Sequence, residues 1–335
     1  MNFDFNSYKS SVISLKESID YILVLHNDYL CIGFLNREIN IYNPEDFTLK
    51  INIKYDENND NDKQYNLGLF LMELNNNKLL SIYDYSKLYI RKINYNDFTY
   101  ETLQIIDNCN YYYLRKSIKS NHIYGINENT LSYIKNINEI ISVLNLKGGM
   151  IEYFYEIPKK NVGEICIKTD LYYSSLLFFD TKKYKLINII FNVNLYRTRR
   201  TQKDYCPFTY FDKYNLLGVF LAHDLIHFID LENHEIKYKY SNTATSYPSI
   251  IYCHKLNDKK YFVVEYFKYC FGFGSSIYLS DLIPQNINCY EFSTNKIQKL
   301  ETLNQTSVKF ACFSNSLKYL VLQIEDNQIK LYSKK

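Results

Sequence analysis

Short runs of apolar and aromatic residues recur along the whole chain, separated by polar turns. Seven of these runs align with one another at an interval of 42 to 61 residues: Ile39–Asn43, Leu88–Lys92, Leu131–Lys135, Leu176–Asp180, Ile226–Asp230, Ile287–Glu291 and Ile329–Ser333. The interval clusters just above the length that four short strands and their turns require. The pattern therefore predicts a β-sheet unit that is repeated seven times.

Each aligned run has a companion just upstream, and in five of the seven units only three turn-forming or charged residues separate the two. This spacing predicts a hairpin between a second and a third strand. The predicted second strands are Leu30–Leu35, Leu79–Asp84, His122–Asn127, Asp170–Ser175, Leu216–Ala222, Tyr261–Phe267 and Tyr319–Glu325. First strands are predicted further upstream, at Ile19–His26, Leu67–Leu74, Tyr111–Ile118, Val162–Ile167, Phe208–Phe211, Ser249–His254 and Val308–Phe313. Fourth strands are predicted downstream, for example at Phe47–Ile53, Phe98–Ile105, Lys185–Phe191 and Ile236–Tyr240.

Four antiparallel strands repeated in this way are typical of a β-propeller, in which radial repetition protects the sheet edges. The seventh unit reaches only its third strand at the end of the chain, whereas a spare strand, Ser11–Leu15, precedes the first unit. We expect Ser11–Leu15 to supply the missing strand and to close the ring. The sequence thus predicts an all-β, seven-bladed β-propeller of four-stranded antiparallel blades, with residues 1–335 as a single domain. Six blades, eight blades and a split sandwich are the alternatives.

The ends of the third strands carry a further pattern, in which an apolar or aromatic residue often precedes an acid, amide or hydroxyl. It is present in Tyr42-Asn43, Phe179-Asp180, Ile229-Asp230, Tyr290-Glu291 and Tyr332-Ser333. In this the units resemble degenerate WD-repeats, whose third strand ends in Trp-Asp. Two units depart from that pattern with Arg91-Lys92 and Ile134-Lys135, and no unit has the family's Gly-His pair. The resemblance implies a rigid, non-catalytic scaffold that binds proteins through its loops.

Composition and charge narrow the function only a little. The chain has 39 Lys and Arg against 36 Asp and Glu, which is far from the basic excess of a nucleic-acid-binding protein. Its 36 Tyr alternate along strands and are better explained by packing than by stacking on RNA. We recognise no secretory signal, no transmembrane segment and no paired Cys spacing. We therefore expect a soluble cytoplasmic protein, with the nucleus as the alternative.

The strongest catalytic lookalike is the segment from His223 to His227, because two His four residues apart on a helix can share a metal. Here the segment spans a predicted hairpin, which places His223 in a turn and His227 on a strand, so no metal site is predicted. Gly272-Phe273-Gly274 lacks the third Gly and the Lys of a phosphate loop and is interpreted as part of a flexible insertion. Signatures of Ser, Cys and kinase catalysis are missing. We expect no enzyme activity and no cofactor.

The loops suggest where partners bind. In a propeller, the connections between blades and the turns between second and third strands emerge on one face, and the acidic segment 56–62, the pair Lys159-Lys160 and the basic segment 196–203 are assigned to that face. The second-to-third connection of unit six expands into an apolar insertion over 268–286. Exposed loops on a rigid scaffold commonly bind partners. The predicted partner-binding residues are Arg197, Arg199, Arg200, Lys203, Phe271, Phe273, Tyr278 and Leu282.

Two functions remain open. The first is a protein–protein interaction scaffold, or a subunit of a larger complex, whose arginines hold an acidic partner and whose apolar loop residues anchor it. The second is a peripheral membrane protein, because Thr198-Arg199-Arg200-Thr201 resembles the Phe-Arg-Arg-Gly motif of phosphoinositide-binding propellers of autophagy, with Thr at both flanking positions. Two adjacent Arg would then hold anionic lipid headgroups. Salt-sensitive vesicle binding distinguishes the second function from the first.

Overall fold

The structure, a computed structural model, describes most but not all of the chain. The described residues are 5–55, 69–74, 77–83, 87–106, 111, 113–117, 123–136, 139–147, 149–158, 164–169, 175–183, 185–191, 208–211, 214–220, 225–241, 248–255, 260–267, 270–273, 276–279, 283–293, 296–304, 310–314 and 316–335. Over 240–304 the description covers the backbone alone.

Among these residues the fold is almost entirely β, apart from short 3₁₀ turns such as η1 (Phe5–Ser7). Five sheets are four-stranded antiparallel meanders in chain order. Sheets 1 to 3 contain β2 (Ile19–Val24), β3 (Leu30–Phe34), β4 (Ile39–Tyr42) and β5 (Leu49–Ile53); β6 (Leu69–Leu74), β7 (Lys78–Tyr83), β8 (Lys87–Asn94) and β9 (Thr99–Ile106); and β10 (Tyr113–Lys116), β11 (Ile123–Asn127), β12 (Thr130–Asn136) and β13 (Glu139–Asn145). Sheets 4 and 5 contain β14 (Ile151–Glu156), β15 (Glu164–Thr169), β16 (Ser175–Asp180) and β17 (Lys185–Ile190); and β18 (Phe208–Phe211), β19 (Leu216–Phe220), β20 (Leu225–Asp230) and β21 (Glu235–Ser241).

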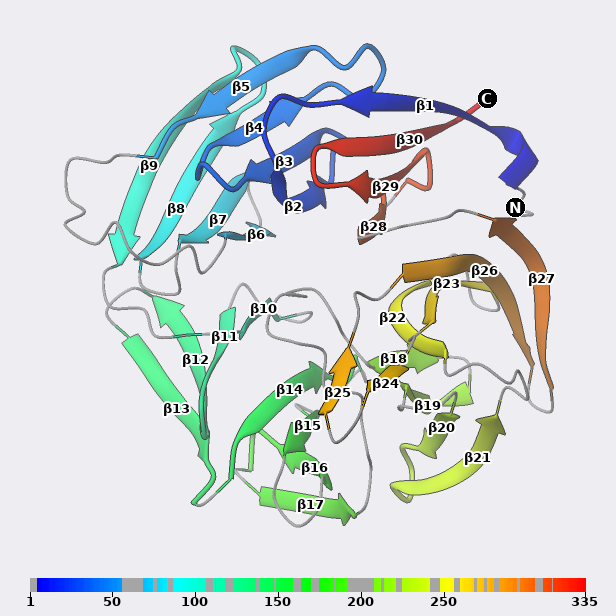
Figure 1. The fold of residues 1–335 in the computed structure, drawn as a ribbon. Coiled ribbons are helices and arrows are strands. Elements are labelled where there is room, and N and C mark those ends of the chain that lie inside the picture. Colours follow the sequence, from blue (N-terminus) through cyan, green and yellow to red (C-terminus); the bar gives the residue numbers. More distant parts are fainter. Residues whose placement is uncertain are drawn as a thin grey trace.

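The last two four-stranded sheets are assembled differently. Sheet 6 contains β22 (Pro248–Lys255), β23 (Lys260–Phe267), β26 (Ile283–Ser293) and β27 (Lys296–Asn304), and between β23 and β26 it carries a separate hairpin of β24 (Cys270–Phe273) and β25 (Ser276–Leu279). Sheet 7 combines the two ends of the chain, in the order β28 (Phe310–Phe313), β29 (Tyr319–Glu325), β30 (Gln328–Lys334) and β1 (Tyr8–Ser14). Figure 1 shows the sheets following one another around a common centre, with the first strand of each sheet innermost, as in a β-propeller.

The core is built from the contacts between successive sheets. Five clusters of buried side chains join sheet 7 to sheet 1, sheet 1 to 2, 2 to 3, 3 to 4 and 4 to 5. Middle strands are covered on both faces by these clusters, so β3 and β16 are buried at every position and read as continuous apolar runs in the sequence. Side chains such as Phe154 and Phe178 are fully buried, and each contributes about 1.5–3 kcal/mol by leaving water. Outer strands such as β9 and β17 stay largely exposed.

The first strand of the chain pairs with the last. β1 runs antiparallel to β30 in a register from Tyr8 opposite Lys334 to Ser14 opposite Gln328. Backbone hydrogen bonds extend the pairing at both ends, because Lys335 N–H donates to the Ser7 carbonyl and Leu15 N–H donates to the Asn327 carbonyl, each over 2.8 Å. The N-terminal strand therefore completes sheet 7, as Figure 1 shows at its upper right.

The strand assignment of the fourth unit from sequence was wrong. The first strand of sheet 4 is β14 (Ile151–Glu156), and β15 (Glu164–Thr169), which contains most of the predicted first strand Val162–Ile167, is the second. Ile151 and Phe154 of β14 are fully buried, which shows why this segment is a strand of the sheet. Of the predicted second strand Asp170–Ser175, only Ser175 is described, as the first residue of β16, and the rest lies outside the described residues. Lys159-Lys160 lies outside the described residues. In the sequence it stands between β14 and β15 of the same sheet, and not between two sheets as the prediction had it.

The strand directions define two faces. Because neighbouring strands are antiparallel, the first-to-second and third-to-fourth connections of every sheet emerge at the same end, here named the turn face. The second-to-third connections and the links between sheets emerge at the other end, here named the connection face. Of the predicted partner-binding residues, the three in β24 and β25 belong to the connection between β23 and β26 and thus to the connection face.

Candidate partner-binding surface

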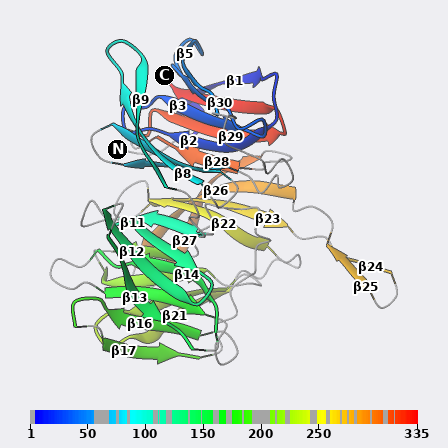
Figure 2. The ribbon, with the colours of Figure 1, turned by 90° about the vertical axis from the view of Figure 1, so that its left-hand side faces the viewer.

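Most residues that the sequence predicted to bind a partner lie outside the described part of the chain: Arg197, Arg199, Arg200, Lys203 and Leu282. The other three lie in the hairpin of β24 and β25, where Phe271 is paired directly with Tyr278 across the two strands and Phe273 is paired with Ser276. Gly272, interpreted from sequence as part of a flexible insertion, lies within β24. Figure 2 shows this hairpin standing away from the four-stranded sheets. The described part of the insertion in the sixth unit is thus a two-stranded hairpin that projects from the four-stranded sheets.

The third strands end in a recurring polar turn on the turn face. Asn43, Asp180 and Asp230, which stand at the Asp position of the WD-like pattern, each accept a backbone N–H from two residues further on, over 2.9–3.1 Å. Asn94 does the same in the second sheet. This is the Asx-turn geometry that short polar side chains favour. The Asn or Asp side chain at the end of these third strands therefore stabilises the turn to the fourth strand.

An aromatic patch is built on the turn face where sheets 1 and 2 meet. It consists of His26, Tyr29, Tyr95 and Phe98, with the carboxylate of Glu73 beneath His26. The rings of Tyr29 and Tyr95 are 5.7 Å apart at 30°, and those of Tyr29 and Phe98 are 6.0 Å apart. All three rings are half-buried and pack on the core between the two sheets. The patch therefore offers ring surface to solvent on a rigid support.

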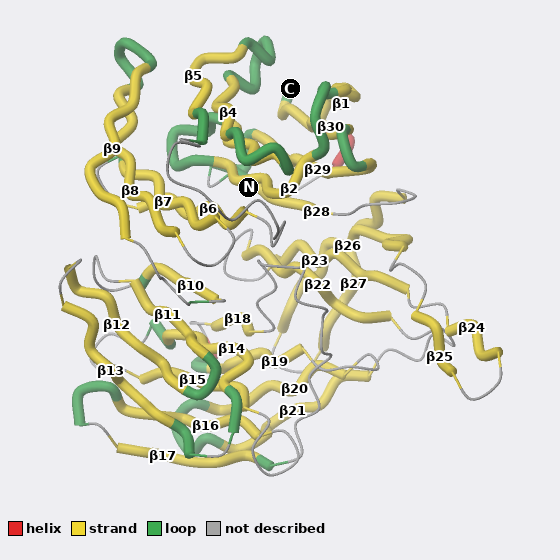
Figure 3. Tube along the Cα trace, turned by 60° about the vertical axis from the view of Figure 1, so that its left-hand side comes forward, coloured by secondary structure: helices red, strands yellow, loops and turns green. Residues whose placement is uncertain are grey.

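Two loops position the patch. Asp28 takes a φ of 69°, which turns the chain between β2 and β3 and sets His26 and Tyr29 on either side of the turn. Phe98 takes a φ of 54° at the end of the β8–β9 turn, in the same way as Phe47 in sheet 1. Asp97 supports this turn by accepting a hydrogen bond from the backbone N–H of Thr99 over 3.2 Å. Figure 3 shows the β8–β9 turn at the end of a long hairpin, at the upper left.

Glu73 gives the patch a negative charge. The His26 backbone N–H donates to Glu73 Oε2 over 2.7 Å, and His26 Nδ1 contacts Glu73 Oε1. Burial, and then the charge of Glu73, raise the pKa of the Tyr95 hydroxyl. The pKa of the fully buried Cys31 thiol is raised by the same two causes in the same order. The carboxylate of Glu73 thus acts electrostatically across the patch.

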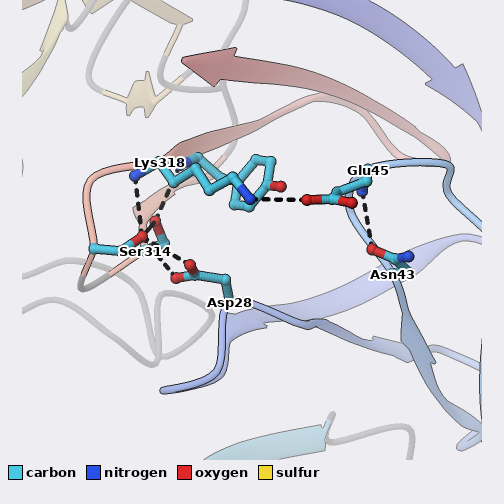
Figure 4. Close-up of polar contacts among 7 residues, drawn as sticks. Asp28, Asn43, Glu45, Ser314 and Lys318 are labelled. Carbon is cyan, nitrogen blue, oxygen red and sulfur yellow. Dashed lines mark hydrogen bonds and ion pairs between the residues drawn. The ribbon is translucent and has the colours of Figure 1, made fainter. Parts of the chain in front are cut away.

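A polar network beside the patch ties sheet 7 to sheet 1, as Figure 4 shows. The Ser316 hydroxyl is 2.8 Å from both carboxylate oxygens of Asp28, and Lys318 Nζ is 2.8 Å from Glu45 Oε1. Side-chain hydrogen bonding and the charge of Lys318 lower the pKa of Glu45. Exposed pairs of this kind contribute little to stability, so the network serves mainly to align the loops of the two sheets.

An unusual cation is buried between sheets 1 and 2. Arg91, which stands at the Trp position of the WD-like pattern, is only 3% exposed. Its Nη1 donates to the Ser81 hydroxyl over 2.5 Å, and its guanidinium lies 4.4 Å from the ring centre of Tyr89 and 5.9 Å from that of Tyr83. Among the described residues, its Nε finds no acceptor and no carboxylate pairs with it. Aromatic faces and one hydroxyl therefore compensate this charge.

The described residues contain no grouping of three His, Cys, Asp or Glu that could hold a metal. His227 lies on β20, as the sequence predicted, while His223 falls outside the described part. Burial and then the charge of Lys239, its cross-strand neighbour, lower the pKa of His227. None of the helical residues that the structure describes forms a segment long and apolar enough to cross a membrane.

Sequence reasoning missed the aromatic patch, although a signal for part of it exists. Asn94-Tyr95-Asn96-Asp97-Phe98-Thr99 repeats the pattern of Asn43-Pro44-Glu45-Asp46-Phe47-Thr48, and both form the same turn with the aromatic residue at positive φ. Aligning the two segments places Tyr95 and Phe98 in an exposed turn. His26, Tyr29 and Glu73 join the patch only because sheet 1 packs against sheet 2. No short sequence pattern around these residues predicts it.

Comparisons with known proteins define the fold. No known protein family matches the chain, and no curated protein sequence matches it. A chain in a crystal structure of the mitotic checkpoint complex is similar, with a TM-score of 0.64 and 12% identity over 99% of this chain and 94% of that chain. Sqt1 of Saccharomyces cerevisiae is similar with a TM-score of 0.59 and 9% identity, over 97% of this chain and 84% of that chain. These likenesses extend over nearly the whole chain and support a β-propeller fold for the protein.

Proposed function

We propose that the protein is a seven-bladed, WD-repeat-like propeller that acts as a non-catalytic scaffold for protein partners or as a subunit of a larger complex. The observation that carries this proposal is the fold, because the likeness to a chain of the mitotic checkpoint complex structure extends over 99% of the residues. A rigid ring of sheets holds loops in fixed positions on two faces, which suits it to binding rather than to chemistry.

The blade count is part of the proposal. It is supported by the seven four-stranded sheets and by the five core clusters that join six of them in succession. Sheet 6 follows sheet 5 and precedes sheet 7 in the chain, so a closed ring requires it to lie between them. The pairing of β1 with β30 would then tie the two ends of the chain into one blade.

Two surfaces are proposed for partners. The aromatic patch on the turn face is favoured by its half-buried rings, because aromatic side chains dominate the binding energy of protein interfaces. The residues predicted from sequence, including Arg199 and Arg200, remain a second candidate on the connection face. The phosphoinositide alternative and the cytoplasmic location rest on the sequence alone.

Affinity purification from lysate of the native cells tests the proposal. Wild-type protein is compared with two folded variants, Arg197→Glu/Arg199→Glu/Arg200→Glu and Tyr29→Leu/Tyr95→Leu, by quantitative mass spectrometry. We expect at least one protein to be recovered in stoichiometric amount with the wild type and to be lost with one of the variants. Recovery of no such protein contradicts the scaffold function. Binding of the wild type to phosphoinositide vesicles at low salt, lost in the arginine variant, would replace it with the lipid-binding function.

A further inference from the structure

We propose that the aromatic patch binds a basic segment of a protein partner, with a lysine or arginine side chain lying over the rings of Tyr29 and Tyr95 within reach of Glu73. The proposal rests on the scaffold function and adds to it the location of the binding surface and the chemistry of the partner.

The first argument is the arrangement of the rings. Tyr29 and Tyr95 lie 5.7 Å apart with their planes only 30° from parallel, and the ring of His26 closes one side at 6.4 Å from Tyr95. The core between sheets 1 and 2 supports these rings from below. Little conformational entropy is therefore lost when a partner binds them. An aromatic face exposed in this way attracts a cation through its quadrupole.

The second argument is that the patch already holds one ammonium group. Lys50 Nζ lies 5.3 Å from the ring centre of Phe98, which borders Tyr29. The face of Phe98 is thus occupied from within the chain. Among the described residues, no Lys or Arg lies over Tyr29 or Tyr95. These two rings form the part of the patch that remains for a cation from a partner.

The third argument is the charge of the loops that carry the rings. Asp28, Glu73 and Asp97 all lie on or under these loops, where Lys50 contacts one of the rings and the nearby Lys318 is already paired with Glu45. Asp28 is bonded to the Ser316 hydroxyl and Asp97 to Thr99, so within the described residues neither carboxylate is neutralised by an ion pair. The field at the patch is therefore negative, which attracts a basic segment and repels an acidic one.

Glu73 adds a hydrogen-bond acceptor to the patch. Its two oxygens contact His26, yet its side chain keeps 16% of its surface exposed beside the rings. A carboxylate accepts up to four hydrogen bonds, so a lysine or arginine that lies over the tyrosines has an acceptor within the same surface. A cation of this kind gains both from the ring faces and from a charge-assisted hydrogen bond.

Fluorescence anisotropy with three labelled nonapeptide libraries tests the proposal on the full chain. The libraries are random except at the central residue, which is Arg or Lys in the first, Ala in the second and Glu in the third. Wild-type protein is compared with Tyr95→Leu and Glu73→Gln. The matched controls are Tyr238→Leu, an exposed tyrosine on β21, and Glu232→Gln, an exposed acid on the β20–β21 turn. Circular dichroism verifies that each variant is folded.

We expect the wild type to prefer the basic library, and Tyr95→Leu and Glu73→Gln each to weaken that binding about 3- to 30-fold, the range of one cation–aromatic contact. The controls should bind as the wild type does. The proposal is overturned if the wild type shows no preference among the libraries, if the patch variants bind unchanged, or if the controls weaken binding equally. A partner that is captured from lysate equally well by wild type and Tyr95→Leu would leave the scaffold function standing and reject the patch as its basis.

Discussion

The buried guanidinium of Arg91 leads to a prediction that runs against the usual effect of core mutations. Removing a buried cation from water costs several kcal/mol, even after the surrounding protein relaxes. Here the compensation is one charge-assisted hydrogen bond, worth about 1.5–3 kcal/mol, and two aromatic faces, worth about 0.5–2 kcal/mol each. These contributions offset the penalty at best. We therefore expect that replacing Arg91 and Ser81 together by apolar residues of suitable shape, Arg91→Met/Ser81→Ala, stabilises the fold by about 1–3 kcal/mol.

The single variants behave differently because each leaves one polar partner behind. Ser81→Ala deprives the guanidinium of its only hydrogen bond to a described residue and is expected to destabilise by about 1–3 kcal/mol. Arg91→Met should change stability by less than about 1 kcal/mol, since it removes a charge but leaves a buried hydroxyl. The double variant is thus more stable than the sum of the two single variants, which is the signature of a coupled pair.

Urea unfolding followed by tyrosine fluorescence and circular dichroism measures these changes, because the chain has 36 Tyr and no Trp. The slopes of free energy against urea must agree among the variants for the comparison to hold. Lys92→Met serves as the control, because it removes the neighbouring exposed cation and should stay within about 0.5 kcal/mol of wild type. A double variant that is destabilised by more than about 2 kcal/mol refutes the reasoning and shows that the buried guanidinium stabilises the fold.

Three further predictions concern stability. Gly218→Ala should destabilise by about 1–3 kcal/mol in urea unfolding, because the new methyl group would lie 2.6 Å from the rigid ring of Phe211. Gly33→Ala meets the flexible side chains of Leu69 and Leu71, which can shift, and should cost less; equal costs would contradict this. The lowered pKa of His227 means that the unfolded chain binds its proton first, so the free energy of unfolding should fall as the pH drops from 7 through about 6.5. This decline should be lost in His227→Leu and should shrink only in part in Lys239→Met, which removes the smaller of the two causes and keeps the burial of the imidazole. Deleting residues 1–14 removes β1 from sheet 7 and should lower the melting temperature in calorimetry, while addition of a peptide of that sequence should restore part of it; no change on deletion would show that β30 needs no partner strand.

Most of the fold could be predicted from the sequence because the repeat has a strong local signal. Middle strands covered on both faces appear as unbroken apolar runs, and the polar turns beside them contain residues such as Asn36 that bond back to the chain. The prediction failed in the fourth unit, where Ile151–Glu156 was left unassigned and the second strand of the sheet, β15, was taken for the first. The composition of a segment indicates that it is a strand but does not fix its position in the sheet.

The binding surface was much less predictable. Loops such as 196–203 are conspicuous in sequence because their charge is local, and so they attracted the prediction to the connection face. The aromatic patch instead combines residues from two sheets, and Glu73 is brought beneath His26 only when sheets 1 and 2 pack together. Arg91 illustrates the same limit, since its departure from the Trp-Asp pattern was visible but its burial between Tyr83 and Tyr89 was not.

The union of β1 with β30 also constrains how the protein is made. β1 leaves the ribosome before the other strands described here, whereas its partner β30 is synthesised after all of them. Sheets 1 to 5 can form in order from neighbouring segments, but sheet 7 has to wait until β30 has been synthesised. Until then β1 lacks the strand that it pairs with in the finished protein. Formation of sheet 7 is therefore expected to be a slow step of high contact order, before which β1 depends on chaperones that keep it from pairing with other chains.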